Sequence, residues 1–175
     1  MKKLILIIFL ISTSHVFAQS KLPKCQGNIS SKYNNCFGEY VFVQQHKYVG
    51  EWKDGLTHGK GTIYYKTGDE YVGEFKNGLR HGQGTYTFTS KDKYTGEWKE
   101  DKQTGMGTYS WVNGDKYIGQ FINNSPNGYG TFFESSGDKY IGMFKNGLYE
   151  GKGTYTSVDG SIYTGIFKDG KFVGK

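Results

Sequence analysis

The stretch from Tyr71 to Phe88 reads YVGEFKNGLRHGQGTYTF and contains two runs in which ring or glycine positions alternate with polar or β-branched ones. The runs cover residues 71–76 and 84–88, and alternation with a period of two predicts β-strands. Asn77-Gly78 follows the first run and is a strong turn signal, because both residues accept a positive φ. The stretch therefore predicts a β-hairpin with a few linking residues before its second strand.

The same hairpin recurs every 23 residues, each time with a glycine two residues after the leading tyrosine. The leading tyrosines are Tyr48, Tyr71, Tyr94, Tyr117, Tyr140 and Tyr163. A motif repeated in register predicts an array of repeats rather than a single globular pocket. A helical array is excluded, because each glycine would cost a helix about 1 kcal/mol.

One face of these hairpins is predicted to carry most of the aromatic side chains. Glycines such as Gly73 lie on that face and leave slots in which a ring from a neighbouring strand can lie over bare backbone. The opposite face carries threonines and pairs such as Glu74 and Lys76, so we expect it to be solvated. The predicted fold is all-β: an elongated single-layer antiparallel sheet of tandem hairpins, twisted into an aromatic-lined trough.

The pattern Tyr-x-Gly-x-(Trp/Phe)-x-x-Gly followed by Gly-x-Gly-Thr-(Tyr/Phe) resembles the MORN (membrane occupation and recognition nexus) repeat. The resemblance covers residues 48–175, which we divide into five full copies and a C-terminal half copy of one strand. Asp101 and Asn124 replace the glycine of the first turn, and Lys91 replaces that of the second. We expect the last strand to leave an open edge that permits a homo-oligomer.

The first 18 residues have the composition of a secretory signal peptide. Lys2 and Lys3 precede a short apolar run from Leu4 to Ile11, and the small residues before Gln19 fit cleavage after Ala18. The apolar run is about half of the roughly 20 residues that a membrane-spanning helix needs, which favours a cleaved leader over a retained anchor. We therefore predict an exported, periplasmic or secreted protein, and the leader suggests a bacterial source.

Residues 19–47 form an N-terminal segment, of which residues 25–47 resemble a degenerate leading copy of the repeat. Its Cys25 and Cys36 are the only cysteines of the chain. In an oxidising compartment two cysteines this close predict a disulfide, which would staple the segment as a cap. A two-ligand metal site is the alternative, although no histidine lies near either cysteine. We predict no metal site and no cofactor.

The composition argues against nucleic-acid binding and against catalysis. The formal charge of +6 falls to +4 without Lys2 and Lys3, and the basic residues are spread along the repeats. The Gly-x-Gly pairs lack the third glycine and the helix of a nucleotide-binding loop. Recurring aspartates such as Asp69 fit turn chemistry, while His58 and His81 share one repeat position and leave a metal or pH-sensing pair open.

The resemblance also suggests names that belong to enzymes. Similar repeats precede the catalytic domains of plant phosphatidylinositol phosphate kinases and of a histone lysine methyltransferase. The repeats of this chain run to its last residue, so we expect no catalytic domain and no enzyme activity.

We predict a scaffold or interaction module that binds a protein, a peptide or a glycan in its aromatic trough. The side chains expected to line the trough are Tyr48, Trp52, Tyr71, Phe75, Tyr94, Trp98, Trp111, Tyr117, Phe121, Tyr140, Phe144 and Tyr163.

Two alternatives remain open. One is peripheral association with anionic phospholipid membranes, which MORN repeats show in some eukaryotic proteins, through a row of lysines on the polar face. That row consists of Lys53, Lys76, Lys99, Lys145 and Lys168, and interleaved glutamates weaken it. The second alternative is a purely structural spacer, in which the rings only cover one another and the glycines.

Overall fold

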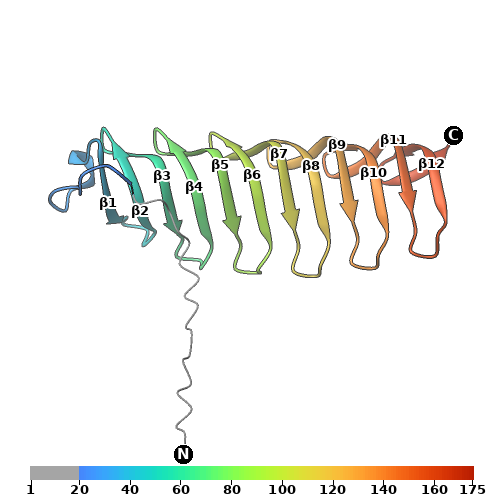
Figure 1. Ribbon diagram of the computed structural model, residues 1–175, viewed down its shortest axis with the longest axis horizontal. Coiled ribbons are helices and arrows are strands. Elements are labelled where there is room, and N and C mark those ends of the chain that lie inside the picture. The colour runs from blue at the N-terminus through green and yellow to red at the C-terminus, as the bar shows by residue number, and fades with distance from the viewer. Residues whose placement is uncertain (1–19) are drawn as a thin grey trace, which may run out of the picture.

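The computed structural model describes residues 20–175, and these form one open antiparallel sheet of 13 strands. Each strand pairs with its neighbours in sequence, so the order in the sheet is the order in the chain. Figure 1 shows the strands side by side along the long axis of the molecule. The predicted fold class is confirmed. The predicted signal peptide, residues 1–18, lies outside the described residues.

The strands alternate between shorter and longer members of each hairpin. They are β1 (Cys36–Val41), β2 (Lys47–Lys53), β3 (Leu56–Tyr64), β4 (Glu70–Lys76), β5 (Leu79–Thr87), β6 (Lys93–Lys99), β7 (Lys102–Ser110), β8 (Lys116–Ile122), β9 (Ser125–Phe133), β10 (Lys139–Lys145), β11 (Leu148–Thr156), β12 (Ile162–Lys168) and β13 (Lys171–Gly174). A short 3-10 helix, η1 (Ser30–Lys32), precedes them.

The tight turns have the left-handed backbone that their residues predict. Asn77 and Gly78 have φ values of 51° and 85°. Where the glycine is missing, Asp101 and Asn124 keep the turn with φ values of 65° and 69°. Aspartate and asparagine adopt this conformation more readily than most side chains, so the departures from the repeat pattern leave the hairpin unchanged.

The prediction that the second strand begins near Gly84 is wrong. Strand β5 begins directly after the turn, at Leu79, and the expected linking residues belong to it. The register shifts from Gly73 opposite Gly84 to Glu74 opposite His81, so a bulge interrupts the pairing with β4. The first half of β5 shows no alternation of side-chain character, which is why the pattern did not reveal it.

The bulge explains a glycine and a glutamate of the motif. Gly82 has a φ of 59°, which strains other residues, and the bulge frees the N–H of Gln83 from the ladder with β4. The Glu74 carboxylate accepts that N–H at 3.2 Å. Glu97 does the same for the N–H of Met106 at 3.0 Å. The expected ion pairs between these glutamates and the neighbouring lysines are not present among residues 20–175.

The leading tyrosines of the first five copies cover the strand glycines, as predicted, and each ring comes from within its own hairpin. Tyr163 does not cover Gly165, which lies against Phe172 and Gly174 instead. Tyr71 lies over Gly73 two residues along the same strand and over Gly84 on the partner strand. Its hydroxyl donates to the carbonyl of Glu74 at the bulge, at 3.0 Å. The tyrosine therefore fills the space of two missing side chains and satisfies one backbone acceptor.

Two further sets of hydrogen bonds join each repeat to the next. At one edge the N–H of Gly78 donates to the carbonyl of Thr57 in the preceding hairpin, at 2.9 Å. At the other edge Asp69 Oδ1 accepts the N–H of Thr89, twenty residues later, at 2.8 Å. The recurring aspartates thus link repeats in addition to shaping their own turns.

The two ends of the array differ from the prediction in detail. The Cys25–Cys36 disulfide is present. Only the second half of residues 25–47 forms a repeat-like strand, β1, and Lys24 pairs with Phe37 as an isolated parallel bridge. At the other end the last copy forms two strands, β12 and β13, rather than one. The predicted homo-oligomer through this edge stays a prediction.

Candidate binding site on the aromatic face

Most of the side chains predicted to line the trough are instead its floor and core. Those that are buried are Tyr48, Trp52, Tyr71, Phe75, Tyr94, Trp98, Tyr117, Phe121, Tyr140 and Phe144. They pack edge to face in a continuous row, in which each tyrosine contacts the indole or phenyl ring of its own repeat and of the next. Only Trp111, half-buried, and Tyr163, 47% exposed, present surface to a partner.

Burial also keeps the buried leading tyrosines protonated. It raises the pKa of Tyr117 and of Tyr140 to about 12, and it raises the pKa of Tyr48 further. These phenols therefore remain neutral hydrogen-bond donors at any physiological pH. Their arrangement suits packing rather than proton transfer.

A second layer of side chains, from the longer strands and the hairpin ends, covers the buried row. The most variable position in this layer is the second residue after the first turn of each repeat. Its residues, in chain order, are Thr57, Arg80, Gln103, Pro126, Tyr149 and Phe172. Because a bulge bends its strand, the segment before it carries this position over the aromatic rings. The residue at this position therefore contributes to how far the rings of each repeat are covered.

Arg80 fills the face in its repeat. Its guanidinium carbon lies 4.4 Å from the centre of the Trp98 ring and 5.4 Å from that of Tyr86. Arg80 Nε is 2.9 Å from Asp101 Oδ1, and its NH2 group donates to the Asp101 carbonyl at 3.0 Å. The cation is thus held by a carboxylate on one side and by ring faces on the other.

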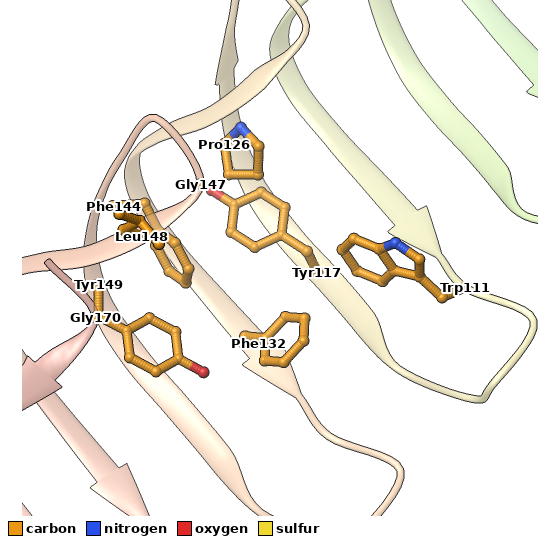
Figure 2. Close-up of a pocket in the computed structure, with 9 residues that line it drawn as sticks. All are labelled: Trp111, Tyr117, Pro126, Phe132, Phe144, Gly147, Leu148, Tyr149 and Gly170. Carbon is orange, nitrogen blue, oxygen red and sulfur yellow. The ribbon is translucent and has the colours of Figure 1, made fainter.

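The face is hollow around Pro126, where an apolar slot of about 340 Å³ opens. Figure 2 shows the indole of Trp111 and the ring of Tyr149 on opposite sides of Phe132, with Pro126 beside Tyr117. Tyr149 is held in place by stacking on Tyr140, with ring centres 3.8 Å apart. The full lining is Trp111, Tyr117, Pro126, Phe132, Phe144, Gly147, Leu148, Tyr149 and Gly170.

A carboxylate lies close to the Tyr149 wall of the slot. Glu134 lies at the hairpin end of β9, and the hydroxyl of Tyr155 donates to its Oε1 at 3.4 Å. Burial, and after it the charge of Glu134, raises the pKa of Tyr149. The slot lining itself contains no lysine or arginine.

Of the residues that line the slot, the sequence predicted Trp111, Tyr117 and Phe144 and missed Pro126, Phe132, Leu148 and Tyr149. Phe132 lies in the second alternating run of its copy and was not among the predicted lining residues, and Leu148 and Tyr149 fall in the segment expected to link the two strands. The signal that could have identified them is the variation at the second residue after the first turn. Pro126 is compact, whereas its neighbours at this position, Gln103 and Tyr149, have longer side chains.

The outer face departs from the prediction of a uniformly solvated surface. One repeat position on this face is a glutamate in the first three copies and changes in the later ones. The residues there are Glu51, Glu74 and Glu97, followed by Gln120, Met143 and Ile166. Met143 and Ile166, together with Ile118 and Tyr129, leave exposed apolar surface over β8 to β12. The outer face is therefore polar in its N-terminal half and mixed in its C-terminal half.

The described residues contain no cluster of three or more side chains suited to holding a metal ion. His58 and His81 lie on the outer face, opposite Glu51 and Glu74 respectively. Within residues 20–175 there is also no helix of the length and apolarity that a membrane span requires.

The repeat pattern matches the family model of the MORN repeat at residues 48–70, 71–93, 94–116, 117–139, 140–162 and 163–175. The chain belongs to the MORN repeat family. MORN repeats are generally non-enzymatic and are typical of proteins engaged in interactions. The matched segments begin at the leading tyrosines, so the family boundaries coincide with the hairpins of the sheet.

Comparison with other proteins adds no functional information to the MORN family assignment. No curated protein matches the sequence. Among solved structures, the SAS-4 (dCPAP) TCP domain of Drosophila melanogaster, in complex with a proline-rich motif of Ana2 (dSTIL), shares 13% identity over 73% of this chain and 76% of its own, with a TM-score of 0.42. A streptogramin B lyase shares 12% identity over 88% of this chain and 47% of its own, with a TM-score of 0.17. Neither likeness supports a conclusion about function.

Proposed function

We propose that this MORN repeat protein is a non-enzymatic interaction module that binds an extended protein segment along its aromatic face. The observation that carries the proposal is the slot between Trp111 and Tyr149. It is apolar, it is lined by side chains of four strands and their turns, and its walls are fixed by stacking and edge-to-face ring contacts. Rigid aromatic side chains around a preformed hollow bind a partner at low entropic cost.

The disulfide between Cys25 and Cys36 supports a site of action outside the cytoplasm, because such bonds persist in oxidising compartments. We propose that the protein works as an exported scaffold after loss of residues 1–18. Its partner is then a protein of the same compartment.

Selection of extended peptides tests this function. A random-peptide display library is panned against the immobilised protein, and selected peptides are measured against two matched variants. Trp111→Ala removes one wall of the slot, whereas Tyr129→Ala removes an exposed ring from the outer face. We expect Trp111→Ala to weaken binding at least ~tenfold and Tyr129→Ala to have no effect.

Peptides that bind both variants equally would contradict the proposal, and failure to select any peptide would favour the spacer. Substitution of Trp52, Trp98 and Phe121 is unsuitable as a test. All three are buried in the core, and their loss would unfold the repeats.

A second candidate function, peripheral binding to anionic membranes, rests on the C-terminal half of the outer face. There Ile118, Tyr129, Met143 and Ile166 are exposed. Lysines stand around them at Lys116, Lys139, Lys145, Lys152 and Lys168. Apolar and aromatic side chains ringed by lysines suit an anionic lipid surface.

Sedimentation with vesicles tests this candidate. The protein should pellet with phosphatidylcholine vesicles that contain phosphatidylglycerol and not with pure phosphatidylcholine vesicles. Lys116→Glu combined with Lys139→Glu should abolish that difference, while Lys53→Glu combined with Lys76→Glu, in the N-terminal half, should leave it. Equal sedimentation with both vesicle types would exclude the candidate.

A further inference from the structure

The repeats allow an occupied and an empty version of one site to be compared within a single chain. Arg80 lies against Tyr71 and Tyr86 of its own repeat and Trp98 of the next, with its guanidinium carbon 5.8, 5.4 and 4.4 Å from the three ring centres. Its side chain is only 19% exposed. The guanidinium is therefore enclosed by ring faces that attract a cation.

The slot consists of the same positions two repeats later. Tyr117, Phe132 and Phe144 are the equivalents of Tyr71, Tyr86 and Trp98, each 46 residues further along the chain. All three line the slot, and Pro126 stands where Arg80 does. Proline lacks the long side chain that would fill the volume, so the cage is present without its arginine.

The charges around the slot also favour a cation. Glu134 acts on Tyr149, one wall of the slot, and lies within hydrogen-bonding distance of Tyr155. The lining has no positive group that would repel a cation. Gly147 takes the place of Asp101, so the direct carboxylate partner of Arg80 has no counterpart. A bound cation would instead meet ring faces, with the Glu134 carboxylate close to the Tyr149 wall.

We propose that the slot receives an arginine side chain of the partner segment, inserted between Trp111 and Tyr149. This inference rests on the proposed function, because a segment lying along the aromatic face must present the side chain. It identifies the partner by chemistry: an extended segment whose anchoring residue is arginine.

The test compares two small probes that differ in charge alone. N-acetyl-arginine methylamide carries the guanidinium, and N-acetyl-citrulline methylamide replaces it with a neutral urea group of nearly the same shape. The readout is the NMR resonance of each tryptophan indole N–H. Trp52 and Trp98 donate theirs to the carbonyls of Gly38 and Gly84, whereas Trp111 lines the slot.

We expect the Trp111 resonance to shift on titration with the arginine probe, at concentrations ~tenfold lower than those the citrulline probe requires. Pro126→Arg should abolish the shift, because the new side chain would fill the slot as Arg80 fills its cage. Tyr129→Arg is the matched control, since it adds the same group to the outer face, and it should leave the shift unchanged.

Three results would overturn the inference: no Trp111 shift with the arginine probe, equal response to the two probes, or an unchanged response in Pro126→Arg. Selected peptides that depend on Trp111 but contain no arginine would overturn it as well, and would leave the proposed function intact. Peptides that do not depend on Trp111 would contradict the proposed function itself, so the two failures are distinguishable.

Discussion

The ring of Tyr94 lies on the backbone of Gly107 in the facing strand of its hairpin, so closely that a Cβ on Gly107 would be 2.6 Å from the tyrosine Cε2. The same ring also covers Gly96, two residues along its own strand. Tyr94 is fully buried, and its hydroxyl is anchored to the carbonyl of Glu97 at 3.0 Å. The ring therefore has no room to move aside, and only glycine fits beneath it.

Gly107→Ala should lower the free energy of unfolding by about 3 kcal/mol, because overpacking in a rigid site displaces the ring and its hydrogen bond. The measurement is urea denaturation followed by tryptophan fluorescence. Met106→Ala, at the neighbouring exposed position, should change the stability by less than about 0.5 kcal/mol. Equal effects of the two substitutions would show that the ring does not rest on Gly107.

This relationship indicates why so much of the fold could be predicted from the sequence. A tyrosine and two glycines at fixed spacing, restated in each copy, specify a strand, a turn and a ring over bare backbone. Because each repeat contacts mainly its neighbours, a correct prediction of one hairpin and its contacts predicts the structure of the whole array.

The parts that could not be predicted depend on residues that break the alternation or vary between copies. Leu79, Arg80 and His81 precede a bulge, so they show no strand pattern although they belong to one. The slot arises because Pro126 differs from its equivalents, and reasoning from shared positions passes over such differences. Most of the predicted lining residues lie on the predicted face but are buried, so they form the floor of the slot and the core beneath the aromatic face.

Arg80 and Trp98 should be energetically coupled. Arg80→Met keeps an apolar stem and removes the charge, and we expect it to cost about 1 kcal/mol of unfolding free energy. In a double-mutant cycle with Trp98→Leu, the loss from Arg80→Met should shrink when the indole is absent. Additive losses would mean that the guanidinium gains nothing from the ring 4.4 Å away.

Acid should weaken the links between repeats. The N–H of Val158 and the hydroxyl of Tyr155 lower the pKa of Asp138, and the N–H of Ser135 lowers that of Asp115. In the unfolded chain aspartate titrates near ~3.9. Since the folded pKa is the lower one, this stabilisation is complete above about pH 5 and is lost as the pH falls through the folded value.

Asp138→Asn tests this linkage, because it keeps an acceptor and removes the charge. The variant should be less stable than the natural protein at pH 7, and the two should converge in urea denaturation as the pH falls below about 3. A stability difference that stays constant from pH 7 to pH 3 would contradict it.

Thr57 should be a site where stability can be gained. Its side chain is buried, and its Oγ1 has no hydrogen-bond partner among the described residues. Thr57→Val keeps the shape and removes the unsatisfied hydroxyl, so it should raise the free energy of unfolding by about 1 kcal/mol. Thr57→Ser keeps the hydroxyl and loses the methyl group, and it should be destabilising. A loss of stability in Thr57→Val would indicate that the hydroxyl is satisfied in solution.

Removal of the disulfide should affect one end of the array and spare the other. The bond closes a loop between Cys25 and Cys36 and holds the segment before β1 against it, where the N–H of Cys25 donates to the carbonyl of Phe37 at 2.9 Å. A disulfide of this loop size contributes about 2–3 kcal/mol. Strand β1, which carries Cys36, is at the edge of the sheet and pairs with β2 alone. Cys25→Ala combined with Cys36→Ala should therefore speed amide hydrogen exchange in β1 and β2. Exchange in β8 to β11, much further along the sheet, should be unchanged. Uniformly faster exchange along the whole sheet would instead mean that the cap stabilises all repeats as one cooperative unit.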